Sequence, residues 1–201
     1  MSSIPWTKAS MPGRELSTDI MKIAFIVGSV RKGSFNLQLS KIAKEVVGDR
    51  AEITYLDIAT IPFMDQDNEF PAPKAVESAR KIVMDSDALW FFTPEYNRSI
   101  PGVLKNATDW LSRPLDPNDP DRRSAVTGKK AIISGIGGGK KTEFSRKALL
   151  DVLTFIGLDV IGGEGKGFSL DRRAFTESIW EPDESVISDI REQAENLLES
   201  I

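Results

Sequence analysis

The chain contains no cysteine and no histidine. Without cysteine there is no disulfide, no thiolate nucleophile and no thiol redox couple. Without histidine there is no Ser-His-Asp triad, and the usual ligand sets of zinc cannot be assembled. An enzyme with this composition must use carboxylates, lysine or hydroxyl groups, or it must take its chemistry from a cofactor.

Excess positive charge and long apolar runs are also missing. The formal net charge is -4, which does not favour a protein that binds nucleic acid through its phosphates. No apolar run is long enough to cross a bilayer, and residues 1–20 contain no apolar block of the signal-peptide type. We therefore expect a cytoplasmic location with no nucleic-acid or membrane partner.

The first twenty residues mix Ser, Pro, Gly and charges without periodicity, which predicts a mobile N-terminal arm at 1–20 and one domain at 21–201. Apolar patterns in that domain predict strands at 22–28, 52–58, 88–93, 129–139 and within 158–165. They predict helices at 36–47, 74–85, 103–113, 143–157 and 183–200. Alternating strands and helices predict an α/β fold whose parallel sheet is covered on both faces. Five strands fit a flavodoxin-like three-layer sandwich of order 2-1-3-4-5, and half of a dinucleotide-binding fold is the alternative.

In that order the winding reverses between strands 1 and 3, and ligands bind outside the carboxyl ends of strands at such a point. The loops there are 28–36, 94–100 and 134–141, which are also the most unusual stretches of the sequence. The first, GSVRKGSFN, enters a helix start, where unpaired N–H groups and a partial positive charge favour an anion. Its donors suit one phosphate monoester: Ser29, Arg31, Ser34 and Asn36. A simpler interpretation, in which Ser34 or Asn36 only caps the helix, needs just one of these residues.

Other phosphate-binding motifs do not match. In SGIGGGKKT, Ser134 stands where the first glycine of a P-loop belongs, and Lys141 stands where its Ser or Thr belongs. A dinucleotide motif after the first strand would need glycine at the position of Val30. Neither an ATPase nor an ordinary Rossmann dehydrogenase is supported.

The segments GSVRKGSFN, TPEYNRSIPGVLKNATDWLSR and GIGGG, in this order, resemble the NAD(P)H-dependent FMN reductases, particularly the bacterial quinone and chromate reductases. The resemblance implies a flavodoxin-like fold, noncovalent FMN and a homodimer or homotetramer. In a protein of this kind, the FMN phosphate would be held by Ser29, Arg31, Ser34 and Asn36. The same turn would be lined by Val30, Lys32, Gly33 and Phe35. The isoalloxazine would lie along Pro94, Glu95, Tyr96 and Asn97, and its other flank would be approached by Ser134, Gly135, Gly137 and Gly138.

The activity that the resemblance implies is hydride transfer from NAD(P)H to FMN and then to a quinone, a metal oxyanion or a similar acceptor. Because the flavin carries the chemistry, we expect no catalytic side chain. A flavodoxin-type electron carrier and a domain that binds a phosphorylated metabolite are the alternatives.

Several conspicuous residues also have simpler interpretations. Glu95 could be only a solvated carboxylate. The segment DPNDPD at 116–121 is expected to be a solvated loop rather than a metal site, because its acids lack ligand spacing. The aromatic residues interpreted as core are Trp90, Phe91, Phe92 and Trp110.

Overall fold

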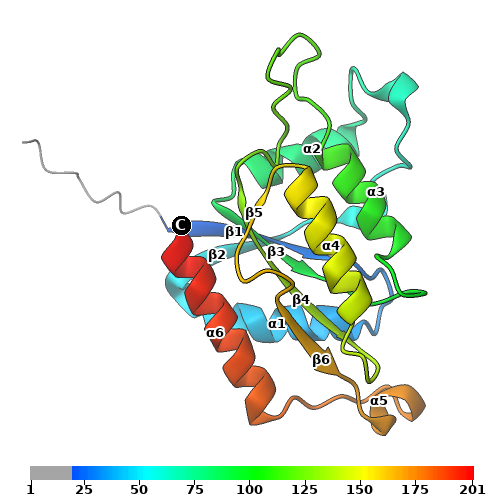
Figure 1. Cartoon of the computed structure of the whole chain (residues 1–201), viewed down its shortest axis with the longest axis vertical. Helices are drawn as coiled ribbons and strands as arrows, with labels where there is room; N and C mark the ends of the chain where they lie inside the picture. Colours follow the sequence, from blue (N-terminus) through cyan, green and yellow to red (C-terminus); the bar gives the residue numbers. More distant parts are fainter. Residues whose placement is uncertain (1–19) are drawn as a thin grey trace, which may run out of the picture.

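The computed structural model describes residues 20–201, so the arm predicted at 1–20 lies outside the described residues except for Ile20. The strands and helices alternate along the chain (Figure 1). They are β1 (Met21–Val27), α1 (Phe35–Val47), β2 (Ala51–Tyr55), α2 (Lys74–Met84), β3 (Ala88–Phe92), α3 (Gly102–Leu111), β4 (Lys130–Gly137), α4 (Glu143–Phe155), β5 (Asp159–Val160), β6 (Lys166–Ser169), α5 (Arg172–Thr176) and α6 (Glu184–Ser200).

The sheet is parallel and has the order β2-β1-β3-β4-β5, which confirms the predicted topology. The position of the last strand is shared by two short segments. β5 pairs with the start of β4, and β6, which the sequence did not predict, pairs with its end. The turn between them contains Gly162, Gly163 and Gly165, all with left-handed φ, so the chain leaves the sheet and returns to it.

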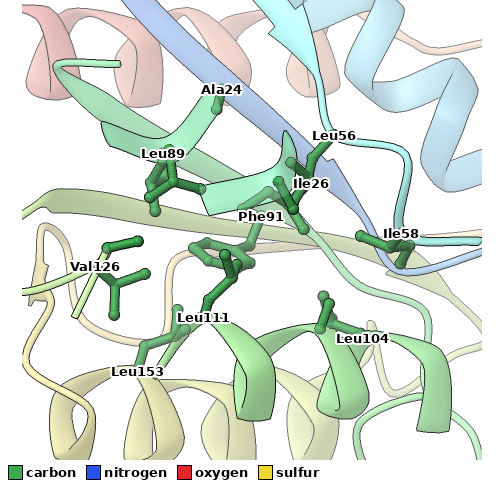
Figure 2. Packing of buried hydrophobic residues seen from close by; sticks show 14 of the residues in the cluster. Ala24, Ile26, Leu56, Ile58, Leu89, Phe91, Leu104, Leu111, Val126 and Leu153 are labelled. Carbon is green, nitrogen blue, oxygen red and sulfur yellow. The ribbon is translucent and has the colours of Figure 1, made fainter. Parts of the chain in front are cut away.

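Alternation along the central strands divides the core into two layers. Ala24, Leu89 and Phe91 belong to the cluster that packs against α2, α3 and α4, whereas Phe25 and Trp90 pack against α1 and α6. Figure 2 shows the first cluster, in which side chains of β3 meet those of α3 and α4. Because both faces of the sheet are covered, the central strand β3 is apolar and buried along its whole length. The core interpretation of Trp90, Phe91 and Phe92 is confirmed, with at most 1% of each exposed.

Trp110 is also a packing residue, as expected. Its side chain is 1% exposed and its indole N–H donates to the carbonyl of Pro62 at 2.8 Å. This bond ties the long connection between β2 and α2 to α3. The segment 116–121 is mostly exposed, as predicted, and Asp119 pairs there with Arg123 at 3.0 Å.

The carboxyl ends of β1, β3 and β4 lie in register, and this register positions the three unusual loops. Val27 is aligned with Phe92, and Phe92 with Ser134. The pairing continues one residue further, since Gly28 N–H donates to Phe92 O at 2.8 Å and Thr93 N–H donates to Ser134 O at 2.9 Å. The three loops therefore begin side by side at one edge of the sheet.

Candidate functional site

A cavity of about 280 Å³ lies at this edge, close to the lower end of the range for small-molecule sites. All three predicted loops line it. The first contributes Ser29, Arg31, Ser34, Phe35 and Asn36, the second contributes Pro94, Glu95 and Tyr96, and the third contributes Ile136, Gly137 and Gly138. Residues about 100 positions apart in the sequence thus meet in one hollow, as the topology predicts.

The first wall of the cavity is the start of α1. Ser34 is the N-cap, and its hydroxyl oxygen accepts the N–H of Leu37 at 3.2 Å, so the capping interpretation is correct for this residue. The next amides, those of Phe35 and Asn36, start the helix, and helical geometry gives them no acceptor within it. The helix start is capped and still has N–H groups available to an anion.

Arg31 lies beside this helix start with its guanidinium held in place. The guanidinium carbon is 5.2 Å from the centroid of the Phe35 ring, in a cation–π arrangement. Gly33 leaves room for it, because a Cβ there would be 3.3 Å from a terminal nitrogen of Arg31. None of the ion pairs found among residues 20–201 involves Arg31. Its charge is therefore available to a ligand in the cavity.

Asn36 has a different role from the one its position suggests. It is 3% exposed, its amide nitrogen donates to Ile136 O at 3.1 Å, and its amide oxygen accepts Ile136 N–H at 3.1 Å. This pair of bonds joins α1 to β4. The side chain is therefore committed to the fold, and what Asn36 can offer a ligand is its backbone N–H.

The second wall is the loop after β3, which is docked on the start of α4. One carboxylate oxygen of Glu95 accepts the N–H groups of Phe144 at 2.9 Å and Ser145 at 3.2 Å. The Arg98 guanidinium lies 5.0 Å from the centroid of the Phe144 ring. Glu95 is thus neither a simple solvated carboxylate nor only a wall of the cavity, because it caps a helix from a distant loop.

The third wall is the glycine loop after β4. At Gly135 a Cβ would lie 2.2 Å from Thr142 Oγ1 and 2.6 Å from the carbonyl oxygen of Thr93, so only glycine fits between these two segments. Gly135 itself lies outside the cavity lining, and the residues of this loop that reach the cavity are Ile136, Gly137 and Gly138.

Arg146 of α4 holds the far side of the glycine loop. Its guanidinium donates to the carbonyls of Lys141, Glu164 and Gly165 at 2.9–3.2 Å. Burial lowers the pKa of Arg146, and three nearby carboxylates, Glu164, Glu143 and Glu95, oppose that shift. The guanidinium therefore serves as a structural clamp between this loop and the β5–β6 turn.

Some predicted site residues lie outside the cavity: Val30, Lys32, Gly33, Asn97, Ser134 and Gly135. Val30 and Lys32 line an adjoining hollow beside the end of β2, which Ser29 and Arg31 also line. Ser134 is fully buried, where its hydroxyl accepts the indole N–H of Trp90 at 2.9 Å and donates to Gln193 at 2.6 Å. These contacts place Ser134 in the core beneath the site.

A fourth wall was not predicted from the sequence. The cavity is lined there by Leu170, which directly follows β6, by Ala174 and Phe175 of α5, and by Ser178 of the turn after α5. The sequence offers one local signal for α5, since the Asp171 carboxylate accepts the N–H of Ala174 at 3.0 Å as an N-cap. Five residues are too few to show a helical period, which explains why the pattern did not predict this helix.

Metal-binding and membrane-spanning features were also sought in residues 20–201. No group of three or more His, Cys, Asp or Glu residues in this range could hold a metal ion. In the same range, no helix combines the length and the apolar character that crossing a membrane requires.

Comparison with known proteins places these observations in a family. A sequence model described as NADPH-dependent FMN reductase matches residues 21–168. A 2-hydroxy-1,4-benzoquinone reductase of Burkholderia sp is 43% identical over 119 residues, or 59% of this chain and 62% of that protein. An NAD(P)H:quinone oxidoreductase of Solanum tuberosum is 42% identical over 127 residues, or 60% of this chain and 63% of that protein. The chain thus spans less than two thirds of the length of these relatives.

Solved structures agree with this placement. FerB, a flavoenzyme NAD(P)H:(acceptor) oxidoreductase from Paracoccus denitrificans, superimposes with a TM-score of 0.77 at 27% identity, over 90% of this chain and 96% of that one. A flavodoxin from the domain Archaea superimposes with a TM-score of 0.56 at 7% identity, over 90% of this chain and 98% of that one, which shows a shared fold alone. The family match covers most of the chain and all three predicted loops. The protein therefore belongs to the family of NADPH-dependent FMN reductases.

Proposed function

We propose that this chain binds FMN and passes reducing equivalents from NAD(P)H to a small-molecule acceptor, with quinones as the first candidates. The observation that carries the proposal is the start of α1, where available amides and the Arg31 guanidinium face the same cavity as the loops after β3 and β4. Family membership and relatives named as quinone reductases support it.

The residues present fit the cofactor. Its terminal phosphate would take Ser29, Arg31 and the amides of Phe35 and Asn36 as donors. Its ring would lie along the loop at Pro94–Tyr96, with the glycine loop on its other flank. FMN, when bound, supplies the two-electron redox chemistry that a chain without cysteine or histidine lacks.

The overall reaction balances as NAD(P)H plus a proton plus a quinone, giving NAD(P)+ and a hydroquinone. The chain's own contribution is to orient the reactants and to fix the loops that contact them, so no side chain is assigned a catalytic role. We place quinones before metal oxyanions such as chromate, because the cavity has an apolar wall of Leu170, Ala174 and Phe175.

Purification and turnover test the proposal. The purified protein should be yellow, and heat-released flavin should run as FMN on chromatography. NAD(P)H should then be oxidised steadily when a quinone is present. Recovery of mainly FAD, or of no flavin after reconstitution with FMN, would contradict the cofactor assignment. A protein that holds FMN and does not oxidise NAD(P)H would instead be an electron carrier.

We also propose that the chain works as a homodimer or homotetramer in the cytoplasm, where NAD(P)H is available. The family resemblance supports the assembly, as do two long connections, at 56–73 and 112–129, which extend beyond the layers of the sandwich (Figure 1). Light scattering on the flavin-loaded protein should give the mass of a dimer or tetramer. A monomer with full activity would contradict this part of the proposal.

A further inference from the structure

The fourth wall of the cavity is firmly anchored. Leu170 N–H donates to Gly137 O at 2.6 Å, which fixes the end of β6 to the end of β4. Ala174 is 3% exposed and packs in the core cluster beneath α1 and α6. The Asp171 carboxylate caps α5. Because both sides of α5 are held in this way, the residue next to Ala174 is presented from a fixed backbone.

That residue is Phe175, an aromatic side chain with two relevant properties. It lines the cavity, and 66% of its surface is exposed. A single exposed apolar side chain elsewhere on a protein is ordinary. An aromatic ring left open on the wall of a ligand cavity offers a flat apolar surface for stacking.

The wall also lies after the segment that the family's sequence model matches. The family match ends at residue 168, whereas Leu170, Ala174 and Phe175 come after it. The residues proposed for FMN all lie within the matched range. The wall is therefore separate in the chain from the residues proposed for FMN, although it lines the same cavity.

The positions of the charged residues around the cavity limit the class of ligand that this wall can bind. The charged residues that line the cavity are Arg31 and Glu95, and neither belongs to this wall. Arg173 of α5 is engaged by Glu177 and Glu181, each at 3.6 Å, and does not line the cavity. The surface presented by Leu170, Ala174 and Phe175 is therefore uncharged.

We infer that this wall is the acceptor subsite, in which a planar, uncharged aromatic or quinoid ring stacks on Phe175. The inference rests on the proposed function, because it assigns the second substrate of the same reaction. Phe175 is accordingly a specificity-determining residue and the cofactor does not depend on it.

The test replaces Phe175 and compares two acceptors of different shape. In Phe175→Ala, KM for menadione, a planar naphthoquinone, should rise roughly five- to tenfold, because one aromatic stack is lost. KM for ferricyanide, a compact anion that cannot stack, should stay within about twofold, as should the Kd for FMN. Phe175→Trp should keep the low KM for menadione. Phe155→Ala is the matched control, because Phe155 is 90% exposed on α4 and lies outside the cavity.

Each other outcome has a definite meaning. If menadione and ferricyanide are affected equally, or neither is affected, Phe175 does not select the acceptor and the inference is wrong. If Phe175→Ala loses FMN, the wall belongs to the cofactor and the inference is also wrong. If the wild-type protein itself binds no flavin or reduces no quinone, it is the proposed function that fails, so the two failures are distinguishable.

Discussion

The starts of α1 and α4 are built alike and used differently. Each helix has 13 residues, and each follows a strand that ends at the same edge of the sheet. At α1 the cap is the neutral hydroxyl of Ser34, and the amides beside it face a cavity that also holds Arg31. At α4 the Glu95 carboxylate already accepts two amides.

This difference explains why only one of the two glycine-containing loops is suited to phosphate. A helix start attracts an anion through its unpaired N–H groups and its partial positive charge. Where the protein supplies its own carboxylate, as at α4, that attraction is satisfied internally and it stabilises the docked loop. Where it supplies only a hydroxyl, as at α1, the attraction is left for a ligand.

The largest expected effect comes from removing the cation at α1. Arg31→Ala should weaken FMN about tenfold to a hundredfold, because a charge-assisted contact to phosphate contributes roughly 1.5–3 kcal/mol. Riboflavin, which has the same ring and no phosphate, should bind as before. Flavin fluorescence quenching measures both affinities. Lys32→Ala, which removes a neighbouring cation outside the cavity, should change the FMN affinity much less. If the ratio of FMN affinity to riboflavin affinity is unchanged in Arg31→Ala, the loop only caps the helix and does not bind the phosphate.

The next effect concerns the packing that brings α4 to the site. Gly135→Ala should lower the free energy of unfolding by about 1–3 kcal/mol, because its Cβ would overlap Thr142 and the carbonyl of Thr93. Gly138→Ala should stay within about 0.5 kcal/mol of wild type, since nothing lies within 4 Å of its Cβ. Urea unfolding of both variants makes the comparison. Equal stabilities would show that the close approach at Gly135 is dispensable.

A smaller effect is expected when α4 is made to resemble α1. Glu95→Ala should lower the free energy of unfolding by roughly 0.5–2 kcal/mol, the usual cost of losing a helix cap. Sulfate should then raise the Tm of this variant more than that of wild type, because the vacated amides can accept an anion. Glu143→Gln is the control, since it removes another carboxylate from the first turn of α4 without touching these bonds. If sulfate raises the Tm of wild type and Glu95→Ala equally, the Glu95 carboxylate does not keep anions from the start of α4, and the proposed difference between the two helix starts is wrong.

The smallest effect is a pH dependence at a third helix start, that of α6. The Ser185 hydroxyl and the Val186 amide bond to the Asp183 carboxylate and hold its pKa below the ordinary value. A group whose pKa is lowered on folding contributes stability at neutral pH and loses it as the pH falls through the folded-state pKa. Asp183→Asn should therefore have a slightly lower Tm than wild type at neutral pH, and this difference should shrink as the pH falls below the ordinary pKa of an aspartate. A difference in Tm that grows in acid would contradict this sign.

The sheet order and the meeting of the three loops were predictable because both follow from patterns that persist over many residues. The apolar runs at β1, β3 and β4 are long enough to identify strands, and the register of parallel strands then places their carboxyl ends together. The family was also predictable, because its motifs are short segments read directly from the chain.

The functions of individual polar side chains were harder to predict. Glu95 and Asn36 do line the cavity, yet their side chains bond to backbone groups about 50 and 100 residues away. No local pattern encodes a partner at that distance. Ser134 is a similar case, because its hydroxyl accepts the indole N–H of Trp90 and donates to Gln193 beneath the site. The wall at Phe175 was missed for the opposite reason, since α5 is too short to produce a pattern at all.

The bond pair between Asn36 and Ile136 determines how this site can change over evolutionary time. Where two side chains contact each other, a substitution on one side can be compensated on the other. Here the partner is the main chain of Ile136, which every amino acid except proline presents in the same form. No replacement at position 136 can therefore compensate for the loss of Asn36. Both side-chain hydrogen bonds between the start of α1 and the end of β4 come from this one residue, and variation in this region should accumulate around Asn36 while sparing it.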